Sequence, residues 1–537
     1  MPNVRKKIII FDRDDWLRGL HPQYGNSLAR SILPYGNNTG RAYNPFYRLG
    51  YLTPGYYPAD YDDGSDITDV QKSGKVYRSG LIATTTGSEL VRTDVSGAIP
   101  DIDDGTTDGV AWPYDINTGS ATCIGEDTAT YISNVSGTAT DTFFYSWRDT
   151  GGSATWNVGR YDGVNGTIDD DFMSTVASGG GDLPTSSGTD VPHPLHVGSD
   201  DTLLIGDRNF VHLYDGRVGN DGTFYEEVLT LPRGYVITAF ADYGDYVMVF
   251  AYKSNAESIG GFSRYVKGEA KAILWDQLSL DPTAVYDLND NFVSEALSYN
   301  GTVVVFTKGR TNDLADPERD CSLQLFDGSK FESVADWIGE SPGRGGAFVR
   351  DRLVWFLDST AVWGWGQYIN GLDSQLFKLH QLTSGTVSGM LSQPNSLYMV
   401  GSNGTASNAW YLNKSKFYRG NIQTAVGLPK FDNEHVGEVT GVKINFAETT
   451  GTDVTDFDVL LYNQDGDNLQ IMSESSYQIT DSNISIKFNN SDFNNFTFTG
   501  LYVVIQWTEN QSAGNTDTQV VESVEVSYEP INLQNLE

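Results

Sequence analysis

Few residues in this sequence have the types and spacing that metal-dependent or acid–base catalysis needs. Among six histidines, only His193 and His196 form an H-x-x-H pair. Pro194 lies between them and no H-E-x-x-H helix surrounds them, so the pair does not match a zinc hydrolase site. No G-x-S-x-G elbow, phosphate-binding loop or dinucleotide fingerprint lies between a predicted strand and a helix. We therefore predict no catalytic residue, no metal and no cofactor, and a protein that is not an enzyme.

One segment, SWRDTGGSATW at 146–156, partly resembles the Asp-box turn of sialidase propellers. It has the expected residue types in the right order, but with insertions, and it occurs only once. Sialidase-like enzymes also need an arginine cluster, and arginines are sparse here, so a propeller glycosidase is the least favoured function. A glycan- or receptor-binding adhesin, like a tail fibre or spike, is the main alternative. Its sugar-stacking residues would be four tryptophans, unless these are buried between blades: Trp147, Trp156, Trp363 and Trp365.

Aspartate-rich segments are the remaining candidates for a metal site. None of them matches the calcium loop D-x-[DN]-x-[DN]-G with its distant glutamate. We interpret them as solvated turns, and calcium binding by one of them stays open; they lie at 61–69, 101–109, 287–291 and 463–468. The two cysteines, Cys123 and Cys321, are too few for a disulfide scaffold. We predict that both are buried free thiols, which fits synthesis in a reducing cytoplasm.

Apolar runs that recur along the sequence are the strands that would position any functional side chains. Five apolar runs open on a polar or turn residue and have the composition of strands buried on both faces. They are DTLLIGD (201–207), DYVMVFAY (245–252), GTVVVFTK (301–308), DRLVWFLD (351–358) and NSLYMVGS (395–402). A further apolar run follows these or similar strands, and four times it ends on an aspartate: Asp162, Asp215, Asp276 and Asp327. We expect its Asp-Gly pairs to form two-residue type I′ hairpin turns.

The spacing of these aspartates predicts the fold class. They are separated by 53, 61 and 51 residues, and about 40–60 residues with four short strands is the period of a propeller blade. Weaker blade-like runs lie upstream, at 79–94, 119–134 and 142–163. The sequence therefore predicts an all-β protein with a β-propeller of seven or eight blades over residues 76–430. Closing the sheets into a ring would remove most exposed sheet edges.

The two ends of the chain have a different texture from the middle. From 431 to 537, six segments alternate apolar and polar residues, which predicts a C-terminal β-sandwich. Residues 1–75 are predicted to form an N-terminal arm, with short helices over 14–33 and then an extended segment. No apolar window of about 18 residues exists, so no membrane association is expected. The start, MPNVRKKIIIF, is too short for a signal peptide.

Charge is unevenly distributed between the arm and the rest of the chain. The net charge is −35, yet residues 1–48 carry eight basic and three acidic residues, so this head has a charge of +5 and the remainder −40. An acidic body of this kind repels nucleic acid, and no specific nucleic-acid binding is expected. Two explanations of this charge distribution stay open: the acidic charge serves solubility or adaptation to salt, or the basic head docks on an acidic neighbour.

The segment RAYNPFYRLGYLTPGYYPADY (41–61) lies where the head meets the body. Six tyrosines and three prolines give it a large aromatic surface without any period, so it cannot form a core of its own. We predict that it contacts a neighbouring subunit; the alternative is that it wraps the chain's own propeller. On the first hypothesis, deleting residues 1–61 leaves the propeller folded and disrupts the assembly. The predicted contact residues are Arg41, Tyr43, Phe46, Tyr47, Arg48, Tyr51, Tyr56 and Tyr57.

The stretch GYLTPGYYPADYDDGSDITD (50–69), followed by weak blades without catalytic residues, resembles virion structural proteins of tailed bacteriophages. In kind it is most similar to the propeller-bearing nozzle proteins of short-tailed phages, over the architecture of residues ~40–430. The resemblance implies a non-enzymatic homo-oligomeric ring, of six copies, that contacts portal, adaptor or other tail proteins and guides DNA exit. It implies a place in the virion tail after assembly in the host cytoplasm. The C-terminal sandwich is not part of what the resemblance implies.

Overall fold

The computed structural model consists almost entirely of β-strands. The residues that it describes are 7–11, 32–33, 56–60, 71–77, 80–85, 89–94, 101–102, 106–107, 109–116, 123–133, 140–149, 156–163, 165–176, 193–218, 221–259, 262–288, 292–308, 320–338, 341–350, 352–358, 361–367, 374–381, 386–393, 396–402, 407–417, 422–427, 435–449, 457–463, 468–472, 485–489, 497–498, 501–507 and 519–532.

Five four-stranded antiparallel sheets follow one another along the chain, each built from four consecutive strands. The first has β11 (Cys123–Ser133), β12 (Thr140–Asp149), β13 (Trp156–Asp162) and β14 (Thr167–Asp169). The second has β15 (Leu195–Val197), β16 (Leu203–Asp207), β17 (Phe210–Asp215) and β18 (Thr223–Thr230). The third has β19 (Tyr235–Tyr243), β20 (Tyr246–Ile259), β21 (Phe262–Asp276) and β22 (Asp281–Asp287). The fourth has β23 (Phe292–Tyr299), β24 (Thr302–Lys308), β25 (Asp320–Phe326) and β26 (Phe331–Ile338). The fifth has β27 (Ala347–Arg350), β28 (Leu353–Asp358), β29 (Ala361–Gly366) and β30 (Gln375–Gln381).

Two further sheets flank these five. One has the order β10-β6-β5-β4, with β7 beside β6, and the other has the order β3-β33-β32-β31. Their bounds are β4 (Gln71–Tyr77), β5 (Gly80–Thr85), β6 (Glu89–Asp94), β7 (Asp101–Ile102), β10 (Tyr114–Asp115), β3 (Tyr56–Asp60), β31 (Thr386–Gln393), β32 (Ser396–Ser402) and β33 (Ser407–Phe417). A small hairpin, β8 (Thr106–Thr107) with β9 (Val110–Ala111), and a π-helical turn at Phe172–Val176 complete this region.

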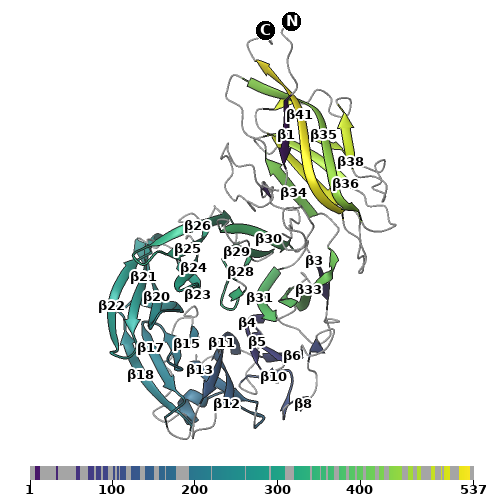
Figure 1. The fold of residues 1–537 in the computed structure, drawn as a ribbon. Helices are drawn as coiled ribbons and strands as arrows, with labels where there is room; N and C mark the ends of the chain where they lie inside the picture. Colours follow the sequence, from purple (N-terminus) through teal and green to yellow (C-terminus); the bar gives the residue numbers. More distant parts are fainter. Residues whose placement is uncertain are drawn as a thin grey trace. The chain divides into compact units, whose positions relative to one another are not determined.

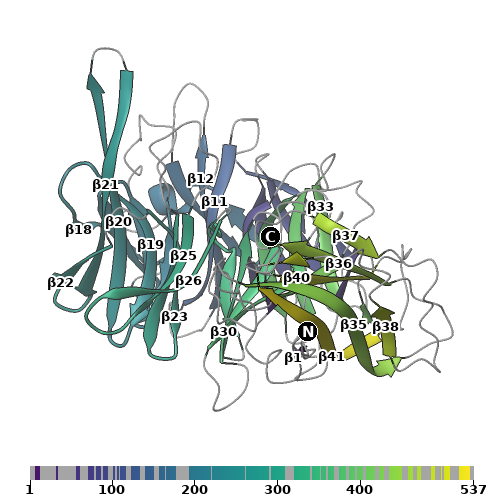
Figure 2. The same ribbon diagram turned by 90° about the horizontal axis from the view of Figure 1, so that it is seen from above.

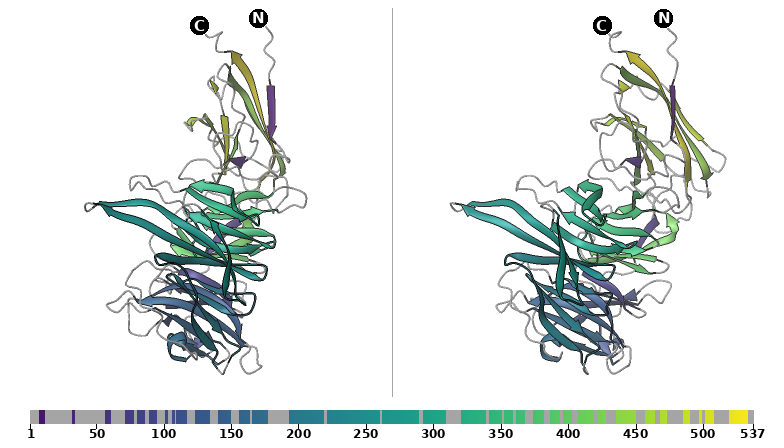
Figure 3. Two further views of the ribbon diagram at one scale, coloured as in Figure 1. Left: turned by 90° about the vertical axis from the view of Figure 1, so that its left-hand side faces the viewer. Right: turned by 60° about the vertical axis from the view of Figure 1, so that its left-hand side comes forward.

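The sheets surround a common axis (Figure 1). Their first strands contact one another in the cyclic order β4, β11, β15, β19, β23, β27, β31 and back to β4. Consecutive up-and-down sheets arranged around an axis define a β-propeller, which agrees with the expected fold class. Figure 3 shows the sheets from the side. Figure 2 shows that the β20–β21 hairpin continues beyond its neighbours, because its pairing reaches Ile259↔Phe262 while β19 ends its pairing at Lys253.

The five apolar runs expected from the sequence are the second strands of five sheets. In β16 every residue is buried, and in β24 the central five residues are buried. A second strand has hydrogen-bonded strands on both sides and a neighbouring sheet against each face, so it is apolar throughout rather than alternating. The hydrophobic core accordingly lies between sheets, as where Tyr131 and Phe144 of β11 and β12 pack against Tyr214 of β17.

The recurring aspartates end, or directly follow, the third strand of four sheets, as expected, but their turns are not two-residue type I′ turns. The loops after β13, β21 and β25 hold four residues between the paired positions, as in Phe326↔Phe331. Each aspartate carboxylate accepts hydrogen bonds from backbone amides two or three residues later, for example from Ser329 and Lys330 to Asp327. These backbone hydrogen bonds lower the pKa of Asp276 and Asp327. A side chain that caps the loop in this way stabilises a four-residue turn instead.

The Asn300-Gly301 pair, with φ of 48° and 80°, forms the two-residue turn between β23 and β24.

The C-terminal residues form two antiparallel sheets, which also take in strands from the beginning of the chain. One has the order β1-β41-β35-β38, with β39 beside β35, and the other has the order β2-β34-β40-β36-β37. Their bounds are β1 (Lys7–Phe11), β41 (Gln519–Asn532), β35 (His435–Thr449), β38 (Ser485–Asn489), β39 (Thr497–Phe498), β2 (Ile32–Leu33), β34 (Ile422–Gly427), β40 (Leu501–Trp507), β36 (Phe457–Asn463) and β37 (Asn468–Met472).

The chain divides into two compact units, each with its own set of residues. One comprises Met1–Ala59, Thr360–Thr383 and Leu412–Glu537, and the other comprises Asp60–Ser359 and Ser384–Tyr411. The boundaries expected at 75/76 and 430/431 stay predictions. Of the helical segment expected at 14–33, only Ile32 and Leu33 are described, and they form strand β2, because their pairing with Val426 and Ala425 satisfies the backbone in an extended conformation.

Candidate functional site

The first strands of five sheets carry a β-bulge close to their starting residue. The pairing register shifts between Gln71 and Ser73, Gly125 and Asp127, Ile237 and Ala239, Val293 and Glu295, and Val387 and Gly389. Because the sheets share one topology, these bulges face the same end of the ring, which we call the N-terminal mouth. A bulge turns its side chains out of the regular alternation, so this mouth is where the ring can position polar groups around its axis.

Arg344 lies at the N-terminal mouth, in the loop between β26 and β27. Its Nη1 is 3.6 Å from Glu126 Oε2, and its Nε is 3.9 Å from Asp127 Oδ2. Its Nη2 donates a hydrogen bond of 3.4 Å to the Thr238 carbonyl of β19. We call Glu126, Asp127, Glu295 and Arg344 the Arg344 hub. From the loop before β27, Arg344 reaches β11 and β19, which lie three and two positions away from β27 in the cyclic order of first strands.

The carboxylates of the hub also hold backbone amides of other sheets. Asp127 Oδ2 accepts a hydrogen bond of 2.9 Å from Leu195 N, at the start of β15. Glu295 Oε2 accepts one of 2.9 Å from Gly345 N, next to Arg344. Arg148 Nε lies 3.0 Å from Glu126 Oε1. The side chains of Arg344, Glu126 and Asp127 are 9–15% exposed, so their charges are largely shielded from water. The arrangement fastens four sheets to one another at the mouth.

Two buried histidines lie in the second sheet, next to the hub. His193, at the start of β15, is 3.0 Å from Asp207 at the end of β16, and both side chains are fully buried. His212 of β17 accepts a hydrogen bond of 3.2 Å at Nδ1 from Glu227 N and stacks on Phe224. Burial lowers the pKa of His212 to about 4, although the Asp207 carboxylate opposes this effect. His212 is therefore neutral at neutral pH.

His193 and His196, which form the H-x-x-H pair of the sequence, each contact a different aspartate. His196 lies 3.0 Å from Asp242 at the end of β19, whereas His193 bonds Asp207 within its own sheet. Because they occupy an extended strand and its lead-in residue, their side chains diverge instead of converging on one ion. In the part of the chain that the structure describes, no group of three or more His, Cys, Asp or Glu side chains is placed to hold a metal ion.

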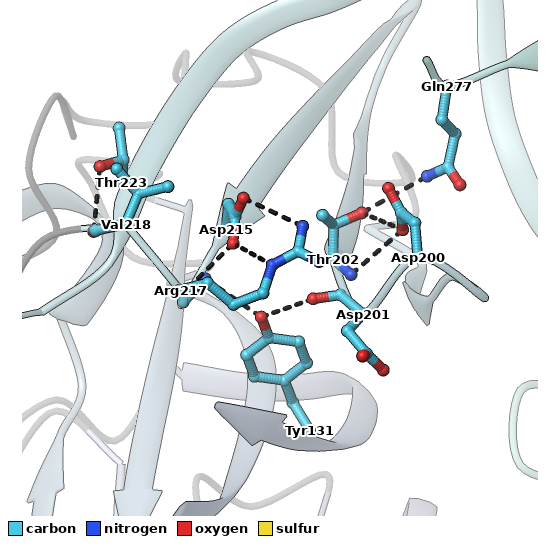
Figure 4. A network of polar contacts seen from close by, with 10 residues as sticks. Tyr131, Asp200, Asp201, Thr202, Asp215, Arg217, Val218, Thr223 and Gln277 are labelled. Carbon is cyan, nitrogen blue, oxygen red and sulfur yellow. Dashed lines mark hydrogen bonds and ion pairs between the residues drawn. The ribbon is translucent and has the colours of Figure 1, made fainter. Parts of the chain in front are cut away.

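The opposite end of the ring carries a second network of polar contacts (Figure 4). Tyr131 of β11 donates a hydrogen bond of 2.6 Å to the Asp201 carbonyl and accepts one of 3.1 Å from Gly216 N. Arg217 pairs with Asp215 at 2.8 Å, and Gln277 donates to Thr202 Oγ1 at 3.4 Å. Loops of three successive sheets are thereby joined. The Asp200 carboxylate accepts hydrogen bonds from Thr202, and the Asp215 carboxylate pairs with Arg217, so both have structural partners.

A third polar contact supports the Asp-box-like segment 146–156. Ser146 and Trp147 lie in β12, and Trp147 Nε1 donates a hydrogen bond of 2.8 Å to the Asp170 carbonyl. The Asp170 carboxylate accepts hydrogen bonds from Tyr145 and Tyr114. Burial, together with the Asp170 charge, raises the pKa of both tyrosines, which stay protonated. Of this segment, the described residues 146–149 lie at the end of β12 and Trp156 begins β13, both in the first sheet.

Three of the four tryptophans considered for sugar stacking are buried. Trp147 is 2% exposed, and Trp363 and Trp365 are each 5% exposed; the side chain of Trp156 lies outside the described residues. Stacking needs an open aromatic face, so these three do not provide a glycan platform. Cys123 and Cys321 are buried free thiols, as expected.

The predicted contact residues of the segment 41–61 fall mainly outside the described residues: Arg41, Tyr43, Phe46, Tyr47, Arg48 and Tyr51. Tyr56 and Tyr57 lie in β3, at the edge of the sheet β3-β33-β32-β31. The choice between contact with a neighbouring subunit and wrapping of the chain's own propeller therefore stays a prediction. Sequence reasoning missed the Arg344 hub, since nothing local marks Arg344 in GESPGRGGAF (339–348).

Comparisons with known proteins give no guide to function. No family model and no curated protein matches the sequence. Among solved structures, the chain is similar to the computationally designed Ika8 protein, at 12% identity and a TM-score of 0.37, over 66% of this chain and 99% of that one. It is also similar to the β-propeller domain of the Trilobed protease from Pyrococcus furiosus, described as having an open velcro topology, at 9% identity and a TM-score of 0.36, over 65% and 96%. The Dos1 propeller is 11% identical with a TM-score of 0.38, over 68% and 96%. Similarity at this level carries no inference about activity or partners.

Proposed function

We propose that this chain is a non-enzymatic structural subunit that assembles with copies of itself into a ring, in the manner of a tail nozzle or tail tube component of a phage virion. The ring would contact other tail, adaptor or portal proteins and guide DNA exit. Within the described residues, no helix has the length and hydrophobicity that crossing a membrane requires.

The observation that carries this proposal is an uncovered apolar edge in the most basic part of an acidic chain. Ile8 and Ile10 of β1 are 59% and 46% exposed, and β1 is the last strand of its sheet. Arg5, Lys6 and Lys7 directly precede them, while the chain beyond residue 48 has a net charge of −40. Edge strands with exposed apolar residues favour pairing with another chain, and opposite charges favour a second copy as the partner.

The Arg344 hub supports a conduit between copies rather than through one propeller. From the loop before β27, Arg344 reaches the distant first strands β11 and β19, and its charge is matched by Glu126 and Asp127. DNA would therefore pass through the opening that several copies enclose. The acidic bodies around this opening would repel the phosphate backbone and let DNA slide without binding.

We also propose that the propeller has seven blades and that the C-terminal sheets pack as a sandwich. The cyclic contacts of seven first strands support the first statement, with β3 completing the sheet that adjoins β4. Strand β41 supports the second, because Val521, Val524, Val526 and Tyr528 are buried while Glu522 is exposed, as in a sheet with one covered face.

Mass measurement and electron microscopy of the purified chain test the assembly. We expect ring particles of several copies at micromolar concentration and their loss when residues 1–12 are deleted, with an unchanged circular dichroism spectrum. This deletion is preferable to one of residues 1–61, because the longer one also removes β3 from its sheet. Deletion of residues 533–537 serves as the control. An intact chain that stays monomeric up to its solubility limit refutes the proposal.

A further inference from the structure

Exposed apolar side chains gather at the outer side of the sheet that contains β22. Leu278 and Leu280, in the turn before this strand, are 89% and 47% exposed, and Val285 within it is 60% exposed. In Figure 1, β22 lies at the outer rim of the ring. Single exposed apolar residues are ordinary, but three within eight residues form a patch of the kind that interaction sites use.

The same stretch is acidic. Residues 276–287 contain Asp276, Asp281 and Asp287 and no lysine or arginine. Every side chain of β22 except Ala284 and Tyr286 is exposed. An apolar patch with acidic flanks fits a partner that brings apolar and basic residues together.

The backbone of β22 is also available for pairing. The strand is the last of its sheet, and in the described ranges no other strand pairs with its outer edge. Its register with β21 is regular from Ala284 to Asp287. Because Pro282 has no backbone N–H, an added strand would pair with the residues after Pro282.

The outer strands of the two neighbouring sheets, β18 and β26, also have irregular edges. In β18, Glu227 has a positive φ of 51°. Strand β26 has one register shift, between Ala335 and Ser333, just as β22 has one between Ala284 and Pro282. An extended strand from another chain needs a regular edge, and β22 is the best acceptor because it combines the regular run Ala284–Asp287 with the exposed patch of Leu278, Leu280 and Val285.

Strand β1 has the complementary properties. It pairs with β41 on one side only, and Ile8 and Ile10 face the same side as Ser527 and Glu525. The sequence RKKIIIF (5–11) joins three basic residues to an apolar run. β1 is thus a short edge strand whose chemistry matches the patch on β22.

We propose that β1 of one copy adds to the outer edge of β22 of the next copy, with Ile8 and Ile10 against the patch of Val285, Leu278 and Leu280. This inference rests on the proposed function, since it names the acceptor surface of the ring contact. The donor and the acceptor are different surfaces, so the contact is heterologous and repeats from copy to copy until the ring closes.

Two variants of the full-length chain test this contact. The donor variant carries Ile8→Glu and Ile10→Glu, and the acceptor variant carries Val285→Glu. We expect each to weaken self-association at least ~30-fold, the effect of losing about 2 kcal/mol at the centre of an interface. Val334→Glu, on the outer strand β26 and 38% exposed in the native protein, is the matched control and should leave association unchanged. Circular dichroism of each variant checks that the fold is retained.

Mixing the two variants gives the decisive measurement. Each variant alone should be monomeric by mass photometry, but the mixture should form dimers, because the donor variant still has an intact β22 and the acceptor variant an intact β1. If the native chain forms rings and neither variant disturbs them, this contact is wrong while the proposed function stands. If the mixture stays monomeric, the pairing of β1 with β22 is refuted. If the native chain itself never associates, both the contact and the proposed function fail.

Discussion

The Arg344 hub gives the sharpest stability prediction: replacing Arg344 with methionine should loosen the N-terminal mouth of the propeller. Methionine keeps much of the side-chain volume and removes the charge and the hydrogen bonds. The substitution removes the guanidinium group, which lies 3.6 Å from the Glu126 carboxylate and 3.9 Å from the Asp127 carboxylate. It also removes the hydrogen bond of 3.4 Å that Arg344 donates to the Thr238 carbonyl.

The magnitude follows from the distances and the burial. At an effective dielectric constant of about 20, each ion pair contributes about 4 kcal/mol before desolvation. The desolvation of Arg344, which is 15% exposed, offsets much of this gain. Glu126 keeps Arg148 at 3.0 Å, but Asp127 loses the cation at 3.9 Å, and removing one partner of a buried charge pair costs about 3 kcal/mol or more. We expect the free energy of unfolding of the propeller to fall by about 3 kcal/mol.

Urea unfolding followed by tryptophan fluorescence measures this change, and hydrogen exchange locates it. The amides of Leu195 and Gly345, which bond hub carboxylates, should exchange faster in the variant. Arg217→Met is the matched control: Arg217 pairs with Asp215 but is 42% exposed, so its loss should cost less than about 1 kcal/mol. Equal effects of the two substitutions would refute the reasoning that the hub fastens the sheets together.

Two further predictions concern buried residues of the first two sheets. Because burial lowers the pKa of His212 to about 4, its neutral form stabilises the fold above the ordinary pKa of about 6.5, and this stability is lost as the pH falls from about 6.5 to 4, by about 3 kcal/mol. His212→Asn should remove that difference in unfolding free energy between pH 7 and pH 4, whereas an unchanged slope would refute the assignment to His212. Gly159→Ala should destabilise the first sheet by about 1–3 kcal/mol, because the new Cβ would lie 2.3 Å from Tyr145 Cζ, while Gly343→Ala, which meets no atom within 4 Å, should be neutral in thermal unfolding.

Local sequence patterns predicted the elements of the propeller well. The five continuous apolar runs are second strands, because a strand between two others with a sheet on each face must be apolar at every position. The recurring aspartates cap the turns after third strands, because a short carboxylate side chain reaches the amides two or three residues on. The exact turn type was wrong, because a four-residue loop capped by Asp also reverses the chain.

The candidate site was much less predictable. Arg344 gave no local signal, since the glycines around it are typical of any loop. The two histidines of the H-x-x-H pair each found a different aspartate, 14 and 46 residues away. Polar contacts of this kind depend on which loops meet at one mouth of a closed ring, and that meeting follows from the blade topology.

The sequence by itself determined the all-β class, the blade-like repeat, the buried thiols and the division between a basic head and an acidic body. These properties depend on the identity and period of neighbouring residues. Only the tertiary structure decided that β1 pairs with β41, that β3 pairs with β33, and that Arg344 joins β11 and β19. Backbone pairing and charge pairing over hundreds of residues are selected by the global packing of sheets, which leaves no period in the sequence from which the partner can be identified.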